Sequence, residues 1–247
     1  MNKTCCILLL LLIAGSAMAA PAVDPVVPVF GSASAKGDLT LSTPMQIVIL
    51  LTLLTLLPAA VMSVSPFLRI IIVLHFLRQA LGTQSAPSNQ VLVGLALFLA
   101  FLIMQPVVID IYHRGWEPVE AGQISWQQGF EEGSKPFKAF LLKFSREKDI
   151  KTCVEMTKSA PPRTPADVEL KVLIPAYILS EMKAGFQIGA VLFLPFLIID
   201  LVVASITLSI GMVQLPPVMV SAPFKILLFV LVDGWNLVVG SLLKSFY

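Results

Sequence analysis

PFLIIDLVVASITLSIGMVQLPP, residues 195–217, is a nearly continuous apolar run that contains one carboxylate, Asp200. A helix that crosses a bilayer needs about 20 mostly apolar residues, and this run has that length. A charged side chain at the bilayer centre costs at least about 2.5–3.5 kcal/mol, so such a group normally faces protein and is paired. The run therefore predicts a membrane helix that packs against other protein, and it raises the question of which group pairs with Asp200.

The composition of the whole chain supports this interpretation. Hydrophobic residues make up 57% of the 247 residues and charged residues only 13%, whereas about 25% charged residues is usual in a soluble domain. Mean hydropathy is +0.88. The net charge of +2 is small and dispersed, without the clustered basic face of a nucleic-acid-binding protein. The chain is expected to be a membrane protein that does not bind nucleic acid.

The first residues, MNKTCCILLLLLIAGSAMAA, have the pattern of a secretory signal peptide. Lys3 precedes a short apolar core, and Ala17 and Ala19 form the small-residue pattern of a cleavage site. We predict a cleavable signal peptide at 1–19, with an uncleaved anchor as the alternative. Residues 20–44 mix Pro, Gly, Ser and Ala without helical periodicity and are expected to be a flexible leader.

Four apolar segments follow this leader, at 45–62, 92–109, 186–213 and 221–243. The first two are just long enough to cross about 30 Å of hydrocarbon, whereas the third would reach about 42 Å as a straight helix. We therefore expect the third segment to tilt, break or leave the membrane. The predicted fold is all-α and membrane-associated, with one apolar helical pair at 45–109 and a second at 172–247.

A polar region at 110–171 separates the two pairs and carries acidic and basic residues in equal number. It contains apolar residues at helical spacing, which predict an amphipathic helix: Phe137, Phe140, Leu141 and Phe144. The connection at 66–90 carries Arg69 and Arg78 but no acidic residue, which places it in the cytoplasm by the positive-inside rule. Residues 110–171 are then expected to form a small helical subdomain on the exported side, in the periplasm.

Every apolar segment contains a proline: Pro58, Pro106, Pro195 and Pro223. Proline inside a helix removes a backbone hydrogen bond and frees a carbonyl that a neighbouring group must satisfy. We therefore expect kinked helices, broken at these prolines and buried among protein neighbours.

Asp200 has a candidate partner in Lys225, and Asp233 comes about two turns later in the same apolar segment. One interpretation is a set of buried charges that fixes the geometry of assembly. The other is a proton or ion path, which normally requires several titratable groups in series. Both interpretations predict that the helices pack against each other or against further copies.

Small and soft residues mark two further places. Gly185 and Gly189 form a G-x-x-x-G pair, which together with Gly211 predicts close helix packing, of the kind that suits an oligomer. The turn GMVQLPP contains Met212 and Gln214. A methionine can adapt to an irregular channel as a compliant seal, but in so apolar a protein it can equally be a packing residue.

We find no catalytic, metal-binding or cofactor-binding motif in the sequence. An intramembrane hydrolase would need facing aspartates, for which Asp200 and Asp233 are the candidates, and a secondary transporter or ion channel would use Asp200 with Lys225. The expectation is a chain that is not an enzyme and holds no cofactor.

Several longer stretches carry a specific resemblance to the FliP family of flagellar biosynthesis proteins. They are LRIIIVLHFLRQALGTQSAPSNQVLVGLALFLAFLIMQPVV (68–108), LIPAYILSEMKAGFQIG (173–189), FLPFLIIDLVVAS (193–205) and APFKILLFVLVDGWNLVVGSL (222–242). The resemblance covers most of residues 45–247, is loose at 113–165 and is absent from the leader.

This resemblance implies a core, non-enzymatic component of the flagellar type III export gate. Members of the family assemble into a pentamer-like ring with FliQ and FliR, near FlhB and FlhA, at the centre of the basal body. The ring forms a closed channel entrance at the bacterial inner membrane, through which flagellar subunits pass unfolded. A homologous gate serves virulence-type injectisomes, which is the alternative within the family.

The resemblance also implies roles for individual residues. Asp200 matches the carboxylate of the family's FLIIDLV stretch and Lys225 the lysine of its PFK stretch, so both would cement assembly. Met212 matches the first position of a methionine-rich loop that seals the pore. Gln214 stands where the family has a further methionine, and Phe193 matches an aromatic residue near the pore wall.

Overall fold

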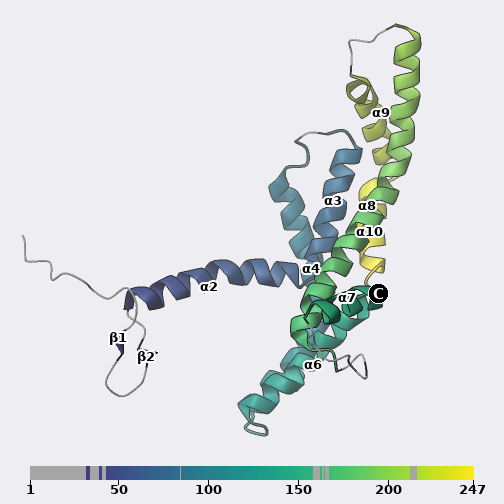
Figure 1. Cartoon of the computed structure of the whole chain (residues 1–247). Helices are drawn as coiled ribbons and strands as arrows, with labels where there is room; N and C mark the ends of the chain where they lie inside the picture. The colour runs from purple at the N-terminus through teal and green to yellow at the C-terminus, as the bar shows by residue number, and fades with distance from the viewer. Residues whose placement is uncertain are drawn as a thin grey trace, which may run out of the picture. The chain divides into compact units, whose positions relative to one another are not determined.

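The computed structural model describes residues 32–33, 39–40, 43–83, 85–157, 162, 164, 167–211 and 216–247. Apart from the two-residue strands β1 (Ser32–Ala33) and β2 (Leu39–Thr40), which pair antiparallel, every regular element in these ranges is helical. The predicted all-α fold class is confirmed (Figure 1). The predicted signal peptide, with Ala17 and Ala19, lies outside the described residues.

The chain divides into two compact units, residues 1–57 and 58–247. The first unit contains the two strands and most of helix α2 (Thr43–Ser63). No side chain in the most apolar stretch of α2 is buried, although this helix is apolar on every face. A helix of this kind needs lipid or other protein around it.

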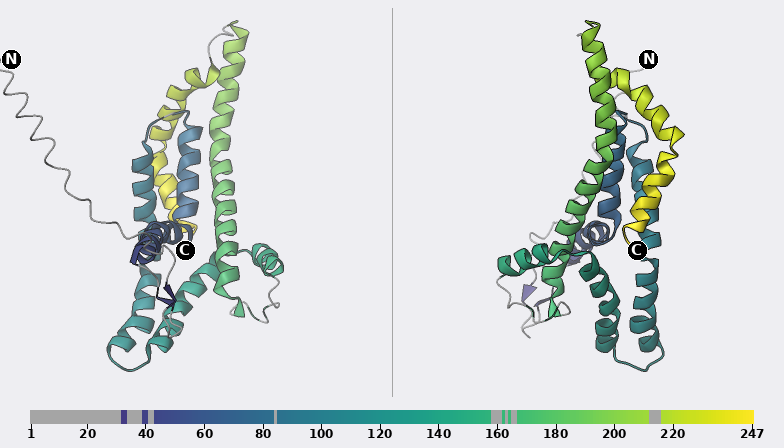
Figure 2. Two further views of the ribbon diagram at one scale, coloured as in Figure 1. Left: turned by 60° about the vertical axis from the view of Figure 1, so that its left-hand side comes forward. Right: turned by 90° about the vertical axis from the view of Figure 1, so that its right-hand side faces the viewer.

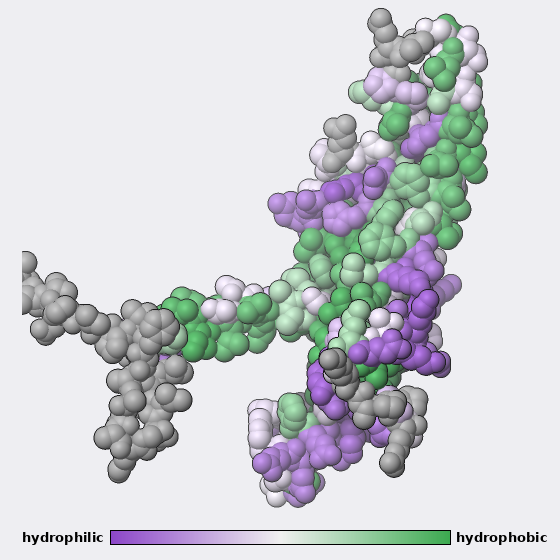
Figure 3. All heavy atoms as spheres, viewed as in Figure 1, coloured by the Kyte–Doolittle hydropathy of each residue, from purple (hydrophilic) through white to green (hydrophobic). Residues whose placement is uncertain are grey.

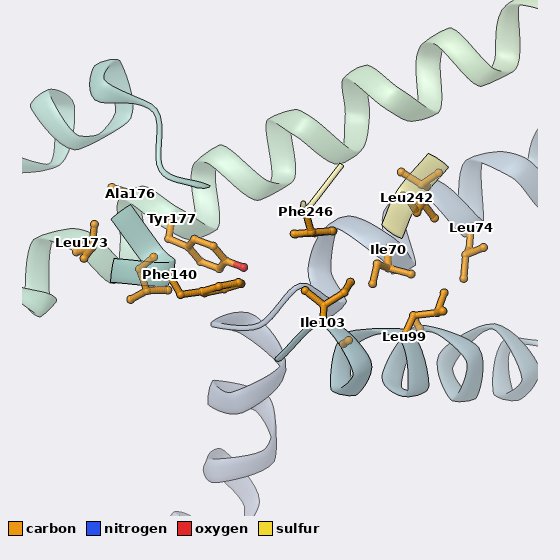
Figure 4. Close-up of a cluster of buried hydrophobic side chains, with 14 of the residues drawn as sticks. Ile70, Leu74, Leu99, Ile103, Phe140, Leu173, Ala176, Tyr177, Leu242 and Phe246 are labelled. Atoms are coloured by element: carbon orange, nitrogen blue, oxygen red, sulfur yellow. The ribbon is translucent and has the colours of Figure 1, made fainter. Parts of the chain in front are cut away.

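Helix α3 (Phe67–Ala80) is the centre of the second unit, packed against α4 (Asn89–Ile111) and α8 (Leu170–Ser209). Its residues Ile70 and Leu74 are completely buried, and they belong to one cluster with Leu99 of α4 and Leu173 of α8 (Figure 4). The sequence predicts a cytoplasmic connection at 66–90, yet more than half of this stretch is a core helix of the fold.

The polar region forms a helical hairpin. Helix α4 continues through a π-helical turn, η1 (Tyr112–Trp116), and α5 (Glu117–Glu120), and the chain returns in α6 (Trp126–Phe144). Helix α7 (Glu147–Met156) comes next. Helix α6 buries Phe140 and Leu141, which confirms the predicted amphipathic helix. Figure 3 shows hydrophilic residues over α6 and α7, in contrast to the hydrophobic far half of α8.

Helix α8 has 40 residues and would measure about 60 Å without interruption. This length is about twice the hydrocarbon thickness of a bilayer. The helix does not break up to Ser209, so the alternatives that the segment tilts or leaves the membrane stay predictions. Its first half packs on α3 and α7, and its second half accompanies α9 (Pro217–Leu231), as Figure 2 shows.

Helix α9 is followed by α10 (Gly234–Lys244), at an angle of 66°. This break lies at Val232–Asp233 rather than at a proline. The four prolines of the apolar segments all lie within helices that continue past them: Pro58, Pro106, Pro195 and Pro223. The helices are therefore not interrupted at these prolines, while a kink at any of them stays a prediction.

Three of the described helices are long and apolar enough to cross a membrane, and a fourth span is possible if α9 and α10 count as one. The three are α2, α4 with its extension to Glu120, and α8. The described part of the chain therefore has the make-up of a membrane protein.

Candidate functional site

The Asp200 carboxylate lies at the contact between α8 and α9. Lys225 Nζ donates a hydrogen bond to Asp200 Oδ2 at 2.6 Å, and Ser221 Oγ donates to Asp200 Oδ1 at 2.5 Å. Lys225 is 1% exposed, and the side chain of Asp200 is 24% exposed. Both carboxylate oxygens and the ammonium group are thus engaged within one chain. We call these three residues the α8–α9 charge cluster.

Local geometry explains how these groups meet. Ser221 and Lys225 are four residues apart on α9 and therefore share one face of the helix. The chain leaves α8 through Gly211, whose φ of +81° is a conformation that favours glycine. Helix α9 begins with Pro217 at its first position, which suits a helix start. Sequence reasoning found Lys225 but missed Ser221, although the i, i+4 spacing was a usable signal.

Asp233 does not join this cluster. It lies in the break between α9 and α10, is exposed, and has a φ of 53°. Its Oδ2 accepts a hydrogen bond from Asn236 Nδ2 at 3.1 Å. The set of three buried charges expected from the sequence therefore becomes one pair, Asp200 with Lys225, and the two aspartates do not face one another as a hydrolase would require.

A second buried charge cluster was missed. Arg69 of α3 donates through Nε to Glu181 Oε2 at 2.9 Å, and its Nη2 bonds the other carboxylate oxygen, so the pair is bidentate. Arg69 is 6% exposed and Glu181 is 0% exposed. Arg69 Nη1 also donates to the backbone oxygen and to the hydroxyl of Ser245. We call Arg69 and Glu181 the α3–α8 ion pair.

A sequence signal for this pair existed. Glu181 stands in the apolar run that begins at Leu170, and an isolated carboxylate there needs a partner just as Asp200 does. Arg69 lies in a stretch that the sequence predicts to be a connection, so it is not an obvious candidate for the partner of Glu181. The separation of 112 residues also conceals the contact.

The predicted packing glycines have separate roles. A Cβ atom at Gly189 would lie 2.6 Å from the Phe76 ring, and one at Gly185 would lie 3.1 Å from Ile72. Both glycines therefore admit α3 within the same chain, rather than serving contacts between copies as the G-x-x-x-G pattern suggested. Gly211 has open space around its Cβ position, so the structure gives it a turn and no helix contact.

The proposed pore residues are only partly described. Met212 and Gln214 lie outside the described residues. Phe193 is half-buried and packs beside a second apolar cluster that includes Leu77 and Phe229. The place of Phe193 near a pore wall stays a prediction.

Among the described residues, no group of three His, Cys, Asp or Glu side chains could hold a metal ion. His75 Nδ1 lies 3.2 Å from Arg78 Nη2, and His113 pairs with Glu117 on the polar hairpin. Burial, and then the charge of Arg78, lower the pKa of His75. The two buried ion pairs, Arg69 with Glu181 and Lys225 with Asp200, each bind one helix to another.

Comparison with known proteins relates this chain to one protein family. A family model described as the FliP family matches residues 50–242. "Flagellar biosynthetic protein FliP" of Pectobacterium carotovorum is 47% identical over 212 residues, covering 86% of this chain and 82% of the relative. The protein of the same name in Bacillus subtilis is also 47% identical, over 83% of this chain and 93% of the relative. The resemblance seen in the sequence is confirmed, and the chain belongs to the FliP family.

Proposed function

We propose that this chain is a structural, non-enzymatic subunit of the flagellar type III export gate. Several copies would assemble with FliQ and FliR into a pentamer-like ring, next to FlhB and FlhA, and would form the closed entrance for unfolded flagellar subunits. The observation that carries this proposal is the family membership over residues 50–242, with relatives that are named flagellar biosynthetic proteins.

The surface of the second half of α8 and of α9 supports assembly. Large apolar side chains there are at least half exposed: Leu194, Leu197, Leu201, Phe224, Leu227 and Leu231. An apolar surface of this extent on one chain normally marks a contact with protein or membrane. It suits a subunit that is surrounded by lipid, by further copies and by other gate proteins in the bacterial inner membrane.

The arrangement of the charges favours this role over a secondary transporter. A transport site needs groups that can exchange their partners for substrate or protons. In the α8–α9 charge cluster, Lys225 is buried and both oxygens of Asp200 already have donors. The pair supports a role in holding two helices together. The names of the relatives favour flagellar use over a virulence-type injectisome.

The layout of the chain accords with the same proposal. A cleaved signal peptide at 1–19 and a leader at 20–44 would precede the apolar pair at 45–109. The hairpin region at 110–171 would lie on the exported side, and 172–247 would return to the gate. Met212 and Gln214 would stand in a pore-sealing loop, with Phe193 close to the pore wall.

Native mass spectrometry of the detergent-extracted protein, produced alone and with FliQ and FliR, tests the proposal. We expect one complex with several copies of this chain and the smaller partners. A monomer or dimer that ignores both partners would contradict it. In the same preparation, Asp200→Ala should reduce the amount of the full complex. Asp233→Asn, at an exposed site, should leave that amount unchanged.

The seal has its own test. If Met212 closes the channel, Met212→Ala should raise ion leakage across membranes that contain the assembled gate. Met219→Ala is a matched control because Met219 is an exposed methionine on the neighbouring helix α9. Equal leakage from both variants and the parent protein would refute the seal.

A further inference from the structure

The α9–α10 arm, defined as residues 217–247, is attached to the rest of its unit near both ends. Near the start, the attachment is Ser221 and Lys225 on Asp200. Near the end, it is the short segment after α10, residues 245–247. The proposed function assigns no role to this second attachment.

Phe246 is the centre of this second attachment. It is 3% exposed, and its ring lies 4.0 Å from the guanidinium carbon of Arg69. The ring also meets Phe144 of α6, with ring centroids 5.2 Å apart. Figure 4 shows Phe246 between the Phe140–Tyr177 side of the buried cluster and the Ile70–Leu242 side.

Polar contacts hold the same segment on both sides of this ring. Arg69 Nη1 donates to the backbone oxygen of Ser245 at 3.2 Å and to its hydroxyl at 3.1 Å. Lys143 Nζ of α6 donates to the backbone oxygen of Phe246 at 3.4 Å. The guanidinium of Arg69 is fixed in advance by its bidentate bond to Glu181, so it presents a rigid donor and a cation to the segment.

Helix α10 itself is only partly enclosed. Gly234 and Leu242 are its buried residues, and three more of its apolar residues, Val238, Val239 and Leu243, are partly buried against the core. At its start the chain turns by 66°, through Asp233 with its left-handed φ of 53°. Few buried apolar contacts are the mark of an element that opens at low free energy. Phe246, which follows α10 directly and is buried, is therefore expected to contribute strongly to the position of this helix.

We infer that Ser245 and Phe246 form a latch, with Arg69 as its receptor, and that this latch positions α10 against α3 and α6. When the latch opens, α10 moves about the break at residues 232–234 while α3 and α8 stay packed. The latch also contributes to an apolar groove of about 530 Å³, whose lining includes Ser245 and Leu237 of the arm together with Val73 and Val191. The inference rests on geometry within one chain and is independent of the proposed function.

Hydrogen–deuterium exchange of the full chain in detergent, resolved by peptide mass spectrometry, tests the latch. We expect Phe246→Ala to raise the exchange rate of the amides in 234–244 by at least about tenfold, as local opening becomes easier. Amides in 70–77 and 173–185 should exchange as in the parent protein. Tyr247→Ala is the matched control, because this neighbouring aromatic residue is 81% exposed and should leave all rates unchanged.

A second variant separates the receptor from general packing. Phe246→Leu keeps an apolar side chain but removes the ring that faces Arg69, and it should give an intermediate rate in 234–244. If Phe246→Ala does not accumulate, Phe246→Leu carries the test by itself. Unchanged exchange in 234–244 would overturn the latch. An equal increase in α3 and α8 would also overturn it, since Phe246 would then be an ordinary part of the whole core.

Discussion

Helix α8 is tied to its neighbours by two ion pairs, one in each half, and protein surrounds them to different degrees. Arg69 and Glu181 are both enclosed, between α3 and α8, with Glu181 completely buried. In the other pair Lys225 is enclosed, but the side chain of Asp200 remains 24% exposed. The first pair lies in the main core of the fold. The second lies where α8 and α9 present exposed apolar surface.

This difference indicates different consequences for the same type of contact. A bidentate Arg–carboxylate pair in a tight core fixes the relative position of two helices and of whatever else the guanidinium binds. A pair at a partly open helix contact is a point where further subunits can complete the enclosure. The comparison predicts that damage to the α3–α8 ion pair lowers the stability of the chain more, whereas damage to the α8–α9 charge cluster lowers stability less and harms assembly in addition.

The largest effect is expected at Glu181. Glu181→Ala leaves Arg69 buried without its carboxylate, and removal of one partner from a buried pair costs about 3–5 kcal/mol. Arg69 also holds Ser245, so its displacement should loosen α10 as well. The measurement is the free energy of unfolding in detergent.

Lys183→Ala is the matched control for Glu181→Ala, because Lys183 is an exposed charge on the same helix, and it should change stability by less than about 0.5 kcal/mol. If Glu181→Ala were as stable as this control, the α3–α8 ion pair would have no weight in the fold.

Asp200→Ala is expected to cause a somewhat smaller loss of stability. We expect about 3 kcal/mol, the low end of the range for buried pairs. Water can reach the place of the lost carboxylate and solvate part of the Lys225 charge. The full-size complex should decrease more than the folded monomer, which separates assembly from folding. Native mass spectrometry and thermal unfolding of the same sample give the two quantities.

A charge exchange sharpens this test. Combining Asp200→Lys with Lys225→Asp restores opposite charges, so it should recover part of the complex that either single change loses. Recovery of assembly is expected from a structural pair. If the double variant assembled no better than the single ones, the specific geometry of Asp200 with Ser221 and Lys225 would matter more than the attraction of charges.

The third effect is steric and belongs to the contact of α3 with α8. Gly189→Ala places a methyl group 2.6 Å from the Phe76 ring, and overpacking of this kind typically costs about 1–3 kcal/mol. Gly94→Ala is the control, because nothing lies within 4 Å of its Cβ position in α4, and alanine should stabilise that helix by up to about 1 kcal/mol. Thermal unfolding of both variants measures the two effects. A Gly189→Ala variant as stable as the parent protein would mean that α3 and α8 can move apart at this contact at little cost.

Much of the fold could be predicted from the sequence, because apolar length and periodicity are local properties. The helical character, the amphipathic α6 and the partnership of Asp200 with Lys225 all follow from such patterns. Helix α3 was missed as a core element because Arg69, His75 and Arg78 give it the charge of a cytoplasmic loop. In the structure, Arg69 turns inward to Glu181, and Arg78 bonds Asn89 at the start of α4.

The remaining differences have a common cause. The contacts of Arg69 with Glu181 and of Phe246 with Phe144 join residues that lie far apart in the sequence, and one sequence does not state such pairings. Asp233 was grouped with Lys225 because both lie in one apolar segment. The 66° break at Val232 and Asp233, where Asp233 has a left-handed φ of 53°, is not revealed by local apolar patterning.

The smallest effect concerns His75, a half-buried residue of α3. Burial, and then the charge of Arg78, lower the pKa of His75 below its ordinary value of 6.5. The unfolded chain therefore binds a proton more readily than the folded one, so stability is fully present above pH 6.5 and decreases as the pH falls through the lowered pKa. The parent protein should lose more stability than His75→Gln between neutral and mildly acidic pH. Thermal unfolding over that range measures the difference, and parallel curves for the two proteins would show that His75 titrates as it does in water.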